Sequence, residues 1–104
     1  MAQFHHVGVP TDVEHPDETY IEGGGVHITD PGASPYSFEY LRFDAGSPMP
    51  DLMQTNPHIA YMVDDLTAAM EGEEVLVEPF EPMPNLRVAF IVRDNIVVEL
   101  MQEV

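Results

Sequence analysis

Alternation of apolar and polar residues predicts three strands in the first half of the chain. Residues 3 to 9 alternate regularly, which places His6 on one face and His5 on the other. Residues 26 to 29 form a second, shorter candidate. The third, residues 36 to 43, carries aromatic and aliphatic side chains on both faces, which is typical of a buried strand.

The segments between these strands lack a periodic apolar pattern. Residues 11 to 25 are acidic and rich in turn-forming residues. They predict only one short helical turn, at residues 16 to 22, where a crossover helix is expected. Residues 44 to 57 contain three prolines, and we expect a connecting loop there.

The second half repeats this order with a clearer helix. Residues 58 to 63 predict a strand with two largely apolar faces, and the Asp64-Asp65 pair caps a short helix over residues 65 to 71. The remaining predicted elements are strands at 74 to 78, 87 to 93 and 96 to 101, a proline-rich loop at 79 to 86, and a hairpin turn at Asp94-Asn95.

Each half therefore has the order strand, helix, strand, strand, strand. A chain of 104 residues can bury one core but hardly two independent ones. We therefore predict a single domain over residues 1 to 104, with one module at about 1 to 50 and a second at about 57 to 104.

Acidic residues dominate the charge of the chain. There are 19 acids, three arginines and no lysine, for a formal net charge of −16. Such a charge repels nucleic acid and anionic membrane surfaces, so we expect neither as a partner. Because salt screens self-repulsion, adaptation to saline surroundings is one hypothesis, and an ordinary solvated acidic surface is the alternative.

Two absences narrow the class of protein further. The sequence has no run of about 18 apolar residues and no signal-peptide pattern, so we expect a cytoplasmic location. It also has no cysteine, so any metal must be held by nitrogen and oxygen ligands.

Each half opens with a histidine and closes with a glutamate on an apolar strand. His6 precedes Glu39 by 33 residues, and His58 precedes Glu99 by 41 residues. Glu99 interrupts the apolar run 96 to 101, where an unpaired carboxylate costs several kcal/mol or stays protonated. Because the chain has so few basic residues, a divalent cation is the favoured source of the missing positive charge.

Glu39 also lies among apolar residues of its predicted strand. Arg42 falls on the opposite face of that strand by strict alternation, so it is a poor ion-pair partner for Glu39. An arginine from a neighbouring strand remains an alternative to a metal at this position.

A single histidine on a buried strand is more often a hydrogen-bonded core residue than a metal ligand. His6 and His58 form a pair, however, and each stands two positions before a small residue, Gly8 or Ala60. A small residue there leaves room beside the imidazole on the same strand face. His5 is expected to point away from His6 and is the weaker candidate ligand.

Four segments of the chain, at residues 6 to 10, 58 to 60, 63 to 66 and 98 to 100, resemble in their order the vicinal oxygen chelate superfamily. This superfamily includes glyoxalases, epimerases, extradiol dioxygenases and bleomycin-resistance proteins. The resemblance implies an α+β fold of two βαβββ-type modules with mixed sheets that curl into an incomplete barrel around a cleft, here with the first-module helix reduced. It also implies that His6, Glu39, His58 and Glu99 are the metal ligands. The matching pieces are His6-Val7-Gly8-Val9-Pro10, His58-Ile59-Ala60, Val63-Asp64-Asp65-Leu66 and Val98-Glu99-Leu100.

The resemblance further implies a small metalloenzyme, a lyase or isomerase of the glyoxalase type. A divalent ion (Ni, Co, Mn, Fe or Zn) stabilises an enediolate formed from a small substrate with adjacent oxygens, and Glu99 is the expected catalytic base. Tyr40, Tyr61 and Phe90 are the expected substrate-binding residues. Three arginines are too few for a glutathione conjugate or a coenzyme A thioester, so we do not expect lactoylglutathione lyase activity.

One alternative is a metal-free protein of the bleomycin-resistance type, which binds a drug or metabolite in the same cleft. Another is a scaffold domain with a relic site. The net charge of −16 suits a cationic ligand, and aromatic side chains suit a flat one. With either function we expect a homodimer, because two open clefts in so small a chain leave strand edges and apolar surface exposed. The sequence does not decide whether the four ligands meet within one chain.

Overall fold

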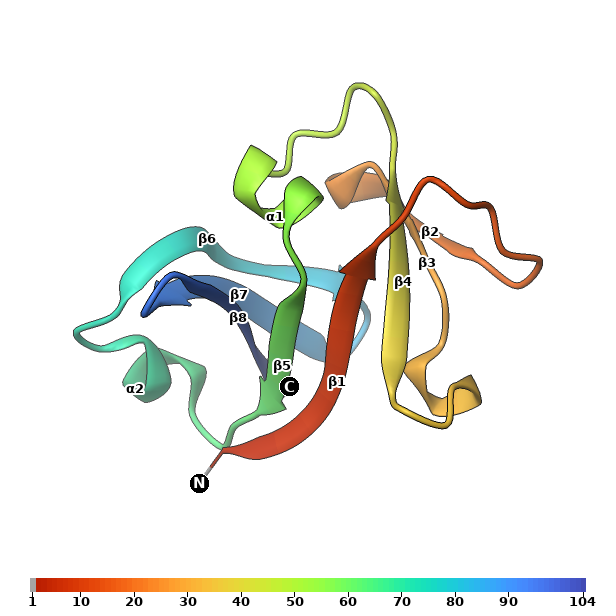
Figure 1. The fold of residues 1–104 in the computed structure, drawn as a ribbon. Helices are drawn as coiled ribbons and strands as arrows, with labels where there is room; N and C mark the ends of the chain where they lie inside the picture. Colours follow the sequence, from red (N-terminus) through yellow and green to blue (C-terminus); the bar gives the residue numbers. More distant parts are fainter. Residues whose placement is uncertain (1) are drawn as a thin grey trace.

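Eight strands form one continuous sheet in the computed structural model, which describes residues 2 to 104. The strands lie in the order β2-β3-β4-β1-β5-β8-β7-β6, and the sheet curls into a half-barrel (Figure 1). This confirms the predicted fold class, a mixed sheet curled into an incomplete barrel with little helix. The strands are β1 (Gln3–Pro10), β2 (Thr19–Ile21), β3 (Val26–Ile28), β4 (Phe38–Phe43), β5 (His58–Met62), β6 (Glu74–Met83), β7 (Leu86–Arg93) and β8 (Ile96–Glu103).

The strand order is symmetric about the central pair, β1 and β5. β1 runs parallel to β4 and places Gly8 opposite Glu39, while β5 runs parallel to β8 and places Ala60 opposite Glu99. β1 and β5 are antiparallel to each other and join the two modules. The repeat in the sequence is therefore also a repeat in the structure, with a histidine-bearing strand beside a glutamate-bearing strand in each module.

The helix predicted at residues 65 to 71 is present as α2 (Leu66–Met70), directly after β5. The Asp65 side chain accepts a hydrogen bond from the Ala68 backbone N–H at 3.2 Å, which caps the helix. None of the helices in residues 2 to 104 has the length and apolar character needed to cross a bilayer.

The first module has no helix between β1 and β2. The helical turn predicted at residues 16 to 22 is wrong, because Thr19 to Ile21 pair with β3 as strand β2. A 3-10 turn follows at Glu22–Gly24, and another lies at Pro31–Ala33. Pairing with β3 satisfies the backbone of this segment, and a helical turn here would forgo that ladder.

Two proline-rich segments predicted as loops contain regular structure, so both predictions are wrong in part. Within residues 44 to 57, Pro50 directly precedes helix α1 (Asp51–Thr55), where a missing N–H costs no helical hydrogen bond, and Met53 is buried. Within residues 79 to 86, β6 continues as far as Met83. β6 lies at the edge of the sheet and pairs with β7 through three register shifts, and an edge strand tolerates prolines.

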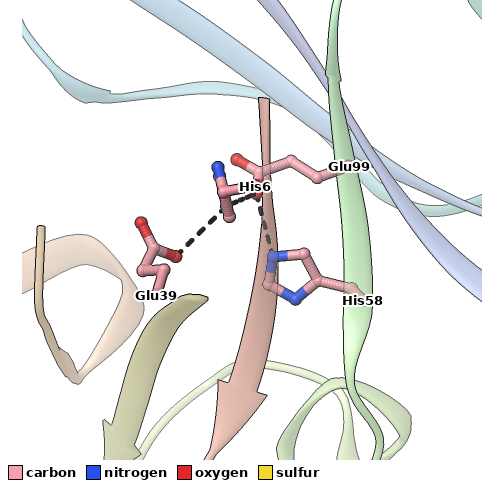
Figure 2. Close-up of side chains that lie close together, drawn as sticks. All are labelled: His6, Glu39, His58 and Glu99. Carbon is pink, nitrogen blue, oxygen red and sulfur yellow. Dashed lines mark hydrogen bonds and ion pairs between the residues drawn. The ribbon is translucent and has the colours of Figure 1, made fainter. Parts of the chain in front are cut away.

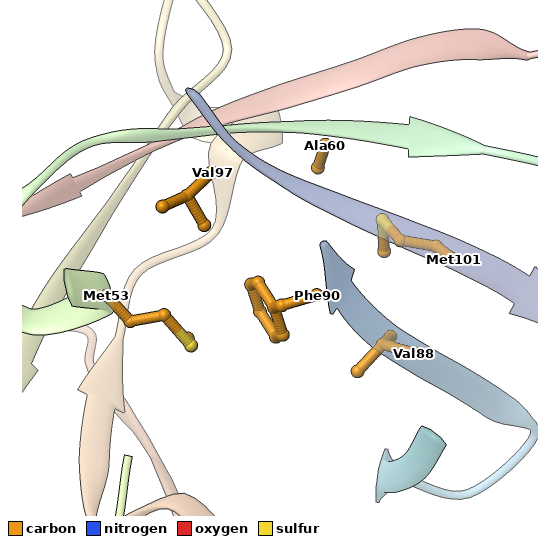
Figure 3. Packing of buried hydrophobic residues seen from close by; sticks show 6 residues of the cluster. All are labelled: Met53, Ala60, Val88, Phe90, Val97 and Met101. Atoms are coloured by element: carbon orange, nitrogen blue, oxygen red, sulfur yellow. The ribbon is translucent and has the colours of Figure 1, made fainter. Parts of the chain in front are cut away.

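Apolar side chains pack on both faces of the second module. The convex face of β7 and β8 packs against Leu66 of α2. Strand alternation thus divides β7 and β8 into positions that face the interior of the half-barrel and positions that face outward. The core on the concave face consists of Met53, Ala60, Val88, Phe90, Val97 and Met101 (Figure 3).

Candidate metal centre

The two histidines and two glutamates meet on the concave face of the four central strands, β4, β1, β5 and β8 (Figure 2). Each residue offers one ligand atom, and the four atoms lie within 4.8 Å of one another. His6 and His58 are each 1% exposed, and Glu99 is 7% exposed. Because all four side chains belong to one chain, no second copy is needed to bring them together.

The separations between the ligand atoms suit a single first-row metal ion. His58 Nε2 lies 3.0 Å from Glu99 Oε1, and His6 Nε2 lies 3.3 Å from the same oxygen. His6 Nε2 also lies 3.4 Å from Glu39 Oε1. For metal–ligand bonds of about 2.1 Å, adjacent ligands at right angles lie about 3.0 Å apart. The donor set therefore fits an ion at its centre with little rearrangement.

Two buried nitrogens of this cluster lack a hydrogen bond within residues 2 to 104, His6 Nε2 and His58 Nδ1, and the first of them faces the carboxylates. Among the described residues, His6 Nε2 has no hydrogen-bond partner, although it faces Glu39 and Glu99. Buried polar atoms in native proteins are nearly always satisfied, so an orphaned one needs an explanation. A metal ion between this nitrogen and the two carboxylates would satisfy all three groups at once.

Without a metal, the cluster balances its charge through a proton on His6. Burial lowers the pKa of His6, but the carboxylates of Glu39 and Glu99 close to its Nε2 outweigh this effect and raise the pKa to about 9. Burial raises the pKa of Glu99, but His58 and His6 lower it below the ordinary carboxyl range. The carboxylates of Glu39 and Glu99 therefore need a positive charge close by, and the protonated His6 supplies it when no cation is bound.

Arginine does not supply that charge. Arg42 Nη2 pairs with Glu18 Oε1 at 2.6 Å, and Arg93 Nη1 pairs with Glu73 Oε2 at 3.2 Å. The ion pairs of Glu39 and Glu99 within residues 2 to 104 are those with histidine. The alternative of an arginine from a neighbouring strand therefore does not hold for Glu39.

The small residues Gly8 and Ala60 make room for the imidazoles across the strand pair. In the β1–β5 register, Gly8 lies opposite His58 and Ala60 lies opposite His6. A Cβ built on Gly8 would overlap the His58 ring. The space at Gly8 therefore accommodates His58 of the opposite strand, whereas the sequence pattern predicts that it accommodates His6 of its own strand.

His5 contacts His6, although strict strand alternation would place the two side chains on opposite faces. The β1–β5 register shifts between Phe4 and His6, and His5 Nδ1 then lies 2.8 Å from His6 Nδ1. His6 thus presents Nε2 to the carboxylates and its other nitrogen to His5. The prediction that His5 points away from His6 is wrong, because a bulge in β1 overrides the two-residue period. No feature of the sequence marks this bulge.

A cavity of about 670 Å³ opens on the concave face, and all four candidate ligands line it. Phe90, one of the three predicted substrate-binding residues, also lines this cavity and meets the His58 ring edge-on, with centroids 5.2 Å apart. Tyr61 lines a different hollow, of about 410 Å³. The Tyr40 ring stacks on His15 with centroids 4.7 Å apart. The structure therefore brings Phe90 to the metal centre and places the two tyrosines elsewhere.

No family model matches the chain, and no curated protein matches its sequence. Among solved structures, the chain is similar to the crystal structure of methylmalonyl-CoA epimerase from Mycobacterium tuberculosis, with a TM-score of 0.58 and 16% sequence identity. The match covers 98% of this chain and 88% of that one. Similarity at this level of identity establishes a shared fold.

Proposed function

We propose that this chain is a small metalloenzyme of the vicinal oxygen chelate type. Its site would hold one divalent ion through His6, Glu39, His58 and Glu99. The observation that carries this proposal is the buried Nε2 of His6, which has no hydrogen-bond partner in residues 2 to 104 and faces two carboxylates. The fold shared with an epimerase and the nitrogen–oxygen donor set support the same conclusion.

The proposed reaction is proton transfer next to a carbonyl, in a lyase or isomerase. An ion held by His6, Glu39, His58 and Glu99 would supply positive charge that stabilises the negative charge developing on a small substrate with two adjacent oxygens. Glu99 is the proposed catalytic base, because its carboxylate is deeply buried yet lines the cavity in which a substrate would lie. Glu39 and the two histidines would hold the ion, and the cavity wall around them is largely apolar.

Metal titration of the purified protein tests the proposal. Protein stripped with a chelator would be titrated calorimetrically with Ni²⁺, Co²⁺, Mn²⁺, Fe²⁺ and Zn²⁺. We expect one ion per chain, and no binding in His58→Ala or Glu99→Ala. Glu78→Gln, an exposed glutamate on β6 that lines neither hollow, is the matched control. Folded protein that takes up none of these ions would overturn the proposal.

A separate experiment, hydrogen–deuterium exchange of candidate substrates, tests the catalytic role. Small hydroxyketones and 2-oxo compounds would be incubated with the loaded protein in D₂O, and proton NMR would follow exchange at the carbon next to the carbonyl. We expect exchange that requires the bound metal, and Glu99→Gln, which also loses the metal, should show none. Stoichiometric metal without exchange of any substrate would leave the metal site standing and refute the catalytic role.

The metal-free binding protein draws less support from the structure. It rests on the charge of −16 and on aromatic side chains that would line a groove for a flat ligand. Tyr61 lines the other hollow, and Tyr36 is 72% exposed. The same titrations discriminate the two functions, because a sequestering protein would bind its ligand with the metal stripped away.

A homodimer remains a proposal. The two ends of the sheet, β2 and β6, are strand edges, and Phe4, Tyr20 and Ile96 expose large apolar side chains. Light scattering coupled to size exclusion would measure the mass in solution, and a monomer at high protein concentration would refute the dimer. The metal centre does not depend on the outcome, since its four residues meet within one chain.

A further inference from the structure

The cavity beside the metal centre is lined without any arginine, and the chain has no lysine. At about 670 Å³ it is large enough for a drug-sized molecule. Its charge is therefore set by acids and histidines alone, and this limits the molecules that it can accept.

Strand alternation explains why the arginines are absent. On β4, Leu41 and Phe43 line the cavity, and Arg42 between them pairs with Glu18 outside it. On β7, Leu86 and Val88 line the cavity, so Arg87 between them belongs to the outward set.

Arg93 shares the outward parity of Arg87. Its side chain is 69% exposed and pairs with Glu73, away from the cavity. All three arginines of the chain thus lie on the convex side of the sheet. A one-residue shift of β4 would have turned Arg42 toward the cavity, and the same shift of β7 would have turned Arg87 and Arg93.

Acids at the rim add negative charge that no ion at the centre cancels. A divalent cation offsets the two carboxylates of Glu39 and Glu99. Asp17, Asp30 and Glu103 also line the cavity and are exposed. An anionic ligand would therefore meet uncompensated like charge on its way in.

The rest of the lining is mostly apolar and adaptable. Methionine is flexible and polarisable, so such a wall fits irregular apolar ligands better than one fixed polar shape. A cationic group of a ligand in the interior of the cavity would find no acid to pair with, because Glu39 and Glu99 would bind the metal. The methionines that line the cavity are Met49, Met53, Met62, Met83 and Met101.

Resting on the proposed function, we infer that the substrate is an uncharged, largely apolar molecule with two adjacent oxygens, of the α-hydroxyketone or 1,2-diketone class. Carboxylates, phosphates and coenzyme A thioesters are excluded by the cation-free lining and the acidic rim. The chain would then share a fold with methylmalonyl-CoA epimerase while taking substrates of a different charge class.

Two chelating probes that differ by one charge test this inference. Benzohydroxamic acid and 4-carboxybenzohydroxamic acid present the same chelating oxygens and the same ring, and calorimetry on the Zn²⁺-loaded protein would give both dissociation constants. We expect the uncharged probe to bind at least about ten-fold more tightly, and the preference to shrink in high salt. The affinities of both probes for Zn²⁺ in water serve as the reference.

Charge-altering variants at the rim provide the second arm. Met83→Arg places a cation at the cavity and should narrow or reverse the preference. Ile96→Arg is the matched control, because Ile96 is similarly exposed (47% against 40% for Met83) but lines the other hollow. The double variant Asp17→Asn, Asp30→Asn should also narrow the preference.

The outcomes separate this inference from the proposed function. A protein that takes up no Zn²⁺ fails the proposed function before either probe is tested. A Zn²⁺-loaded protein that binds the carboxylated probe as tightly as the uncharged one, or more tightly, refutes the substrate class and leaves the metal centre intact. Equal effects of Met83→Arg and Ile96→Arg would also refute it, because the rim would then not decide the preference.

Discussion

The imidazole of His58 packs directly on the backbone of Gly8, its partner across the β1–β5 strand pair. A side chain at position 8 would occupy the space of that ring. The equivalent pair on the same two strands is His6 and Ala60, which also lie opposite each other, and here the small residue carries a methyl group. The two histidines thus reach the centre of the sheet because each is matched with a small residue on the opposite strand.

Gly8→Ala should therefore displace His58 and weaken metal binding by more than ten-fold. Overpacking of this kind costs about 1 to 3 kcal/mol in the free energy of unfolding. Calorimetric titration and urea denaturation would measure the two effects. Gly46→Ala is the matched control, since a Cβ there meets no atom within 4 Å. Unchanged metal affinity in Gly8→Ala would show that the ring position is not critical.

Glu99→Gln should abolish metal binding and also destabilise the metal-free protein, because it removes the buried carboxylate that pairs with His6 and His58. Removing one member of a buried pair costs about 3 to 5 kcal/mol. The pKa of Glu99 is lowered by folding, so its stabilisation is fully present above the ordinary value of 4.5 and is lost as the pH falls toward about 2. Urea denaturation at a series of pH values should show that the difference in the free energy of unfolding between wild type and variant becomes smaller in acid. A constant gap would contradict the pairing.

Metal binding should release a proton from His6 at neutral pH. The pKa of His6 in the metal-free protein is raised to about 9, so the ring is protonated at pH 7 and must lose that proton to coordinate. The apparent association constant should rise about ten-fold per pH unit up to about pH 9 and then level off. Calorimetry in buffers of different ionisation enthalpy counts the protons released. Binding without proton release would mean that His6 is not a ligand.

His5→Ala should lower metal affinity about ten-fold while leaving the fold intact. Partners of a ligating histidine orient its ring, and their loss typically weakens binding by this order. His5 contacts the Nδ1 of His6 at 2.8 Å, whereas His15 stacks on Tyr40. His15→Ala is therefore the control, and the visible spectrum of the Co²⁺-loaded protein would report a changed coordination geometry. An identical spectrum and affinity in His5→Ala would exclude a positioning role.

Salt should stabilise the fold as a whole. A net charge of −16 on 104 residues produces self-repulsion, which ions screen within about 3 Å at molar concentration. The thermal midpoint should rise by several degrees between low salt and molar sodium chloride, measured by circular dichroism. Sucrose at matched osmolality separates screening from general exclusion effects. A midpoint unchanged by salt would refute saline adaptation.

The sequence by itself predicted two strand-rich modules that share one core and pointed to the four residues of the centre, while the curl into an incomplete barrel was implied by the family resemblance. Strand periodicity and the repeated order of elements are local signals, and they predicted the two-module sheet correctly. Glu99 stood out because a carboxylate in an apolar run needs positive charge and the chain has almost none to offer. Composition and burial therefore led to the same four side chains that the structure brings within 4.8 Å of one another.

Only the tertiary structure decided how these side chains are arranged. The bulge that turns His5 toward His6, the edge position that lets β6 continue past its prolines, and the pairing of Gly8 with His58 all depend on a neighbouring strand. The outward direction of the three arginines depends on register in the same way. A local pattern records which residues alternate, but the register between distant strands determines which of them meet, because hydrogen bonds between those strands set it.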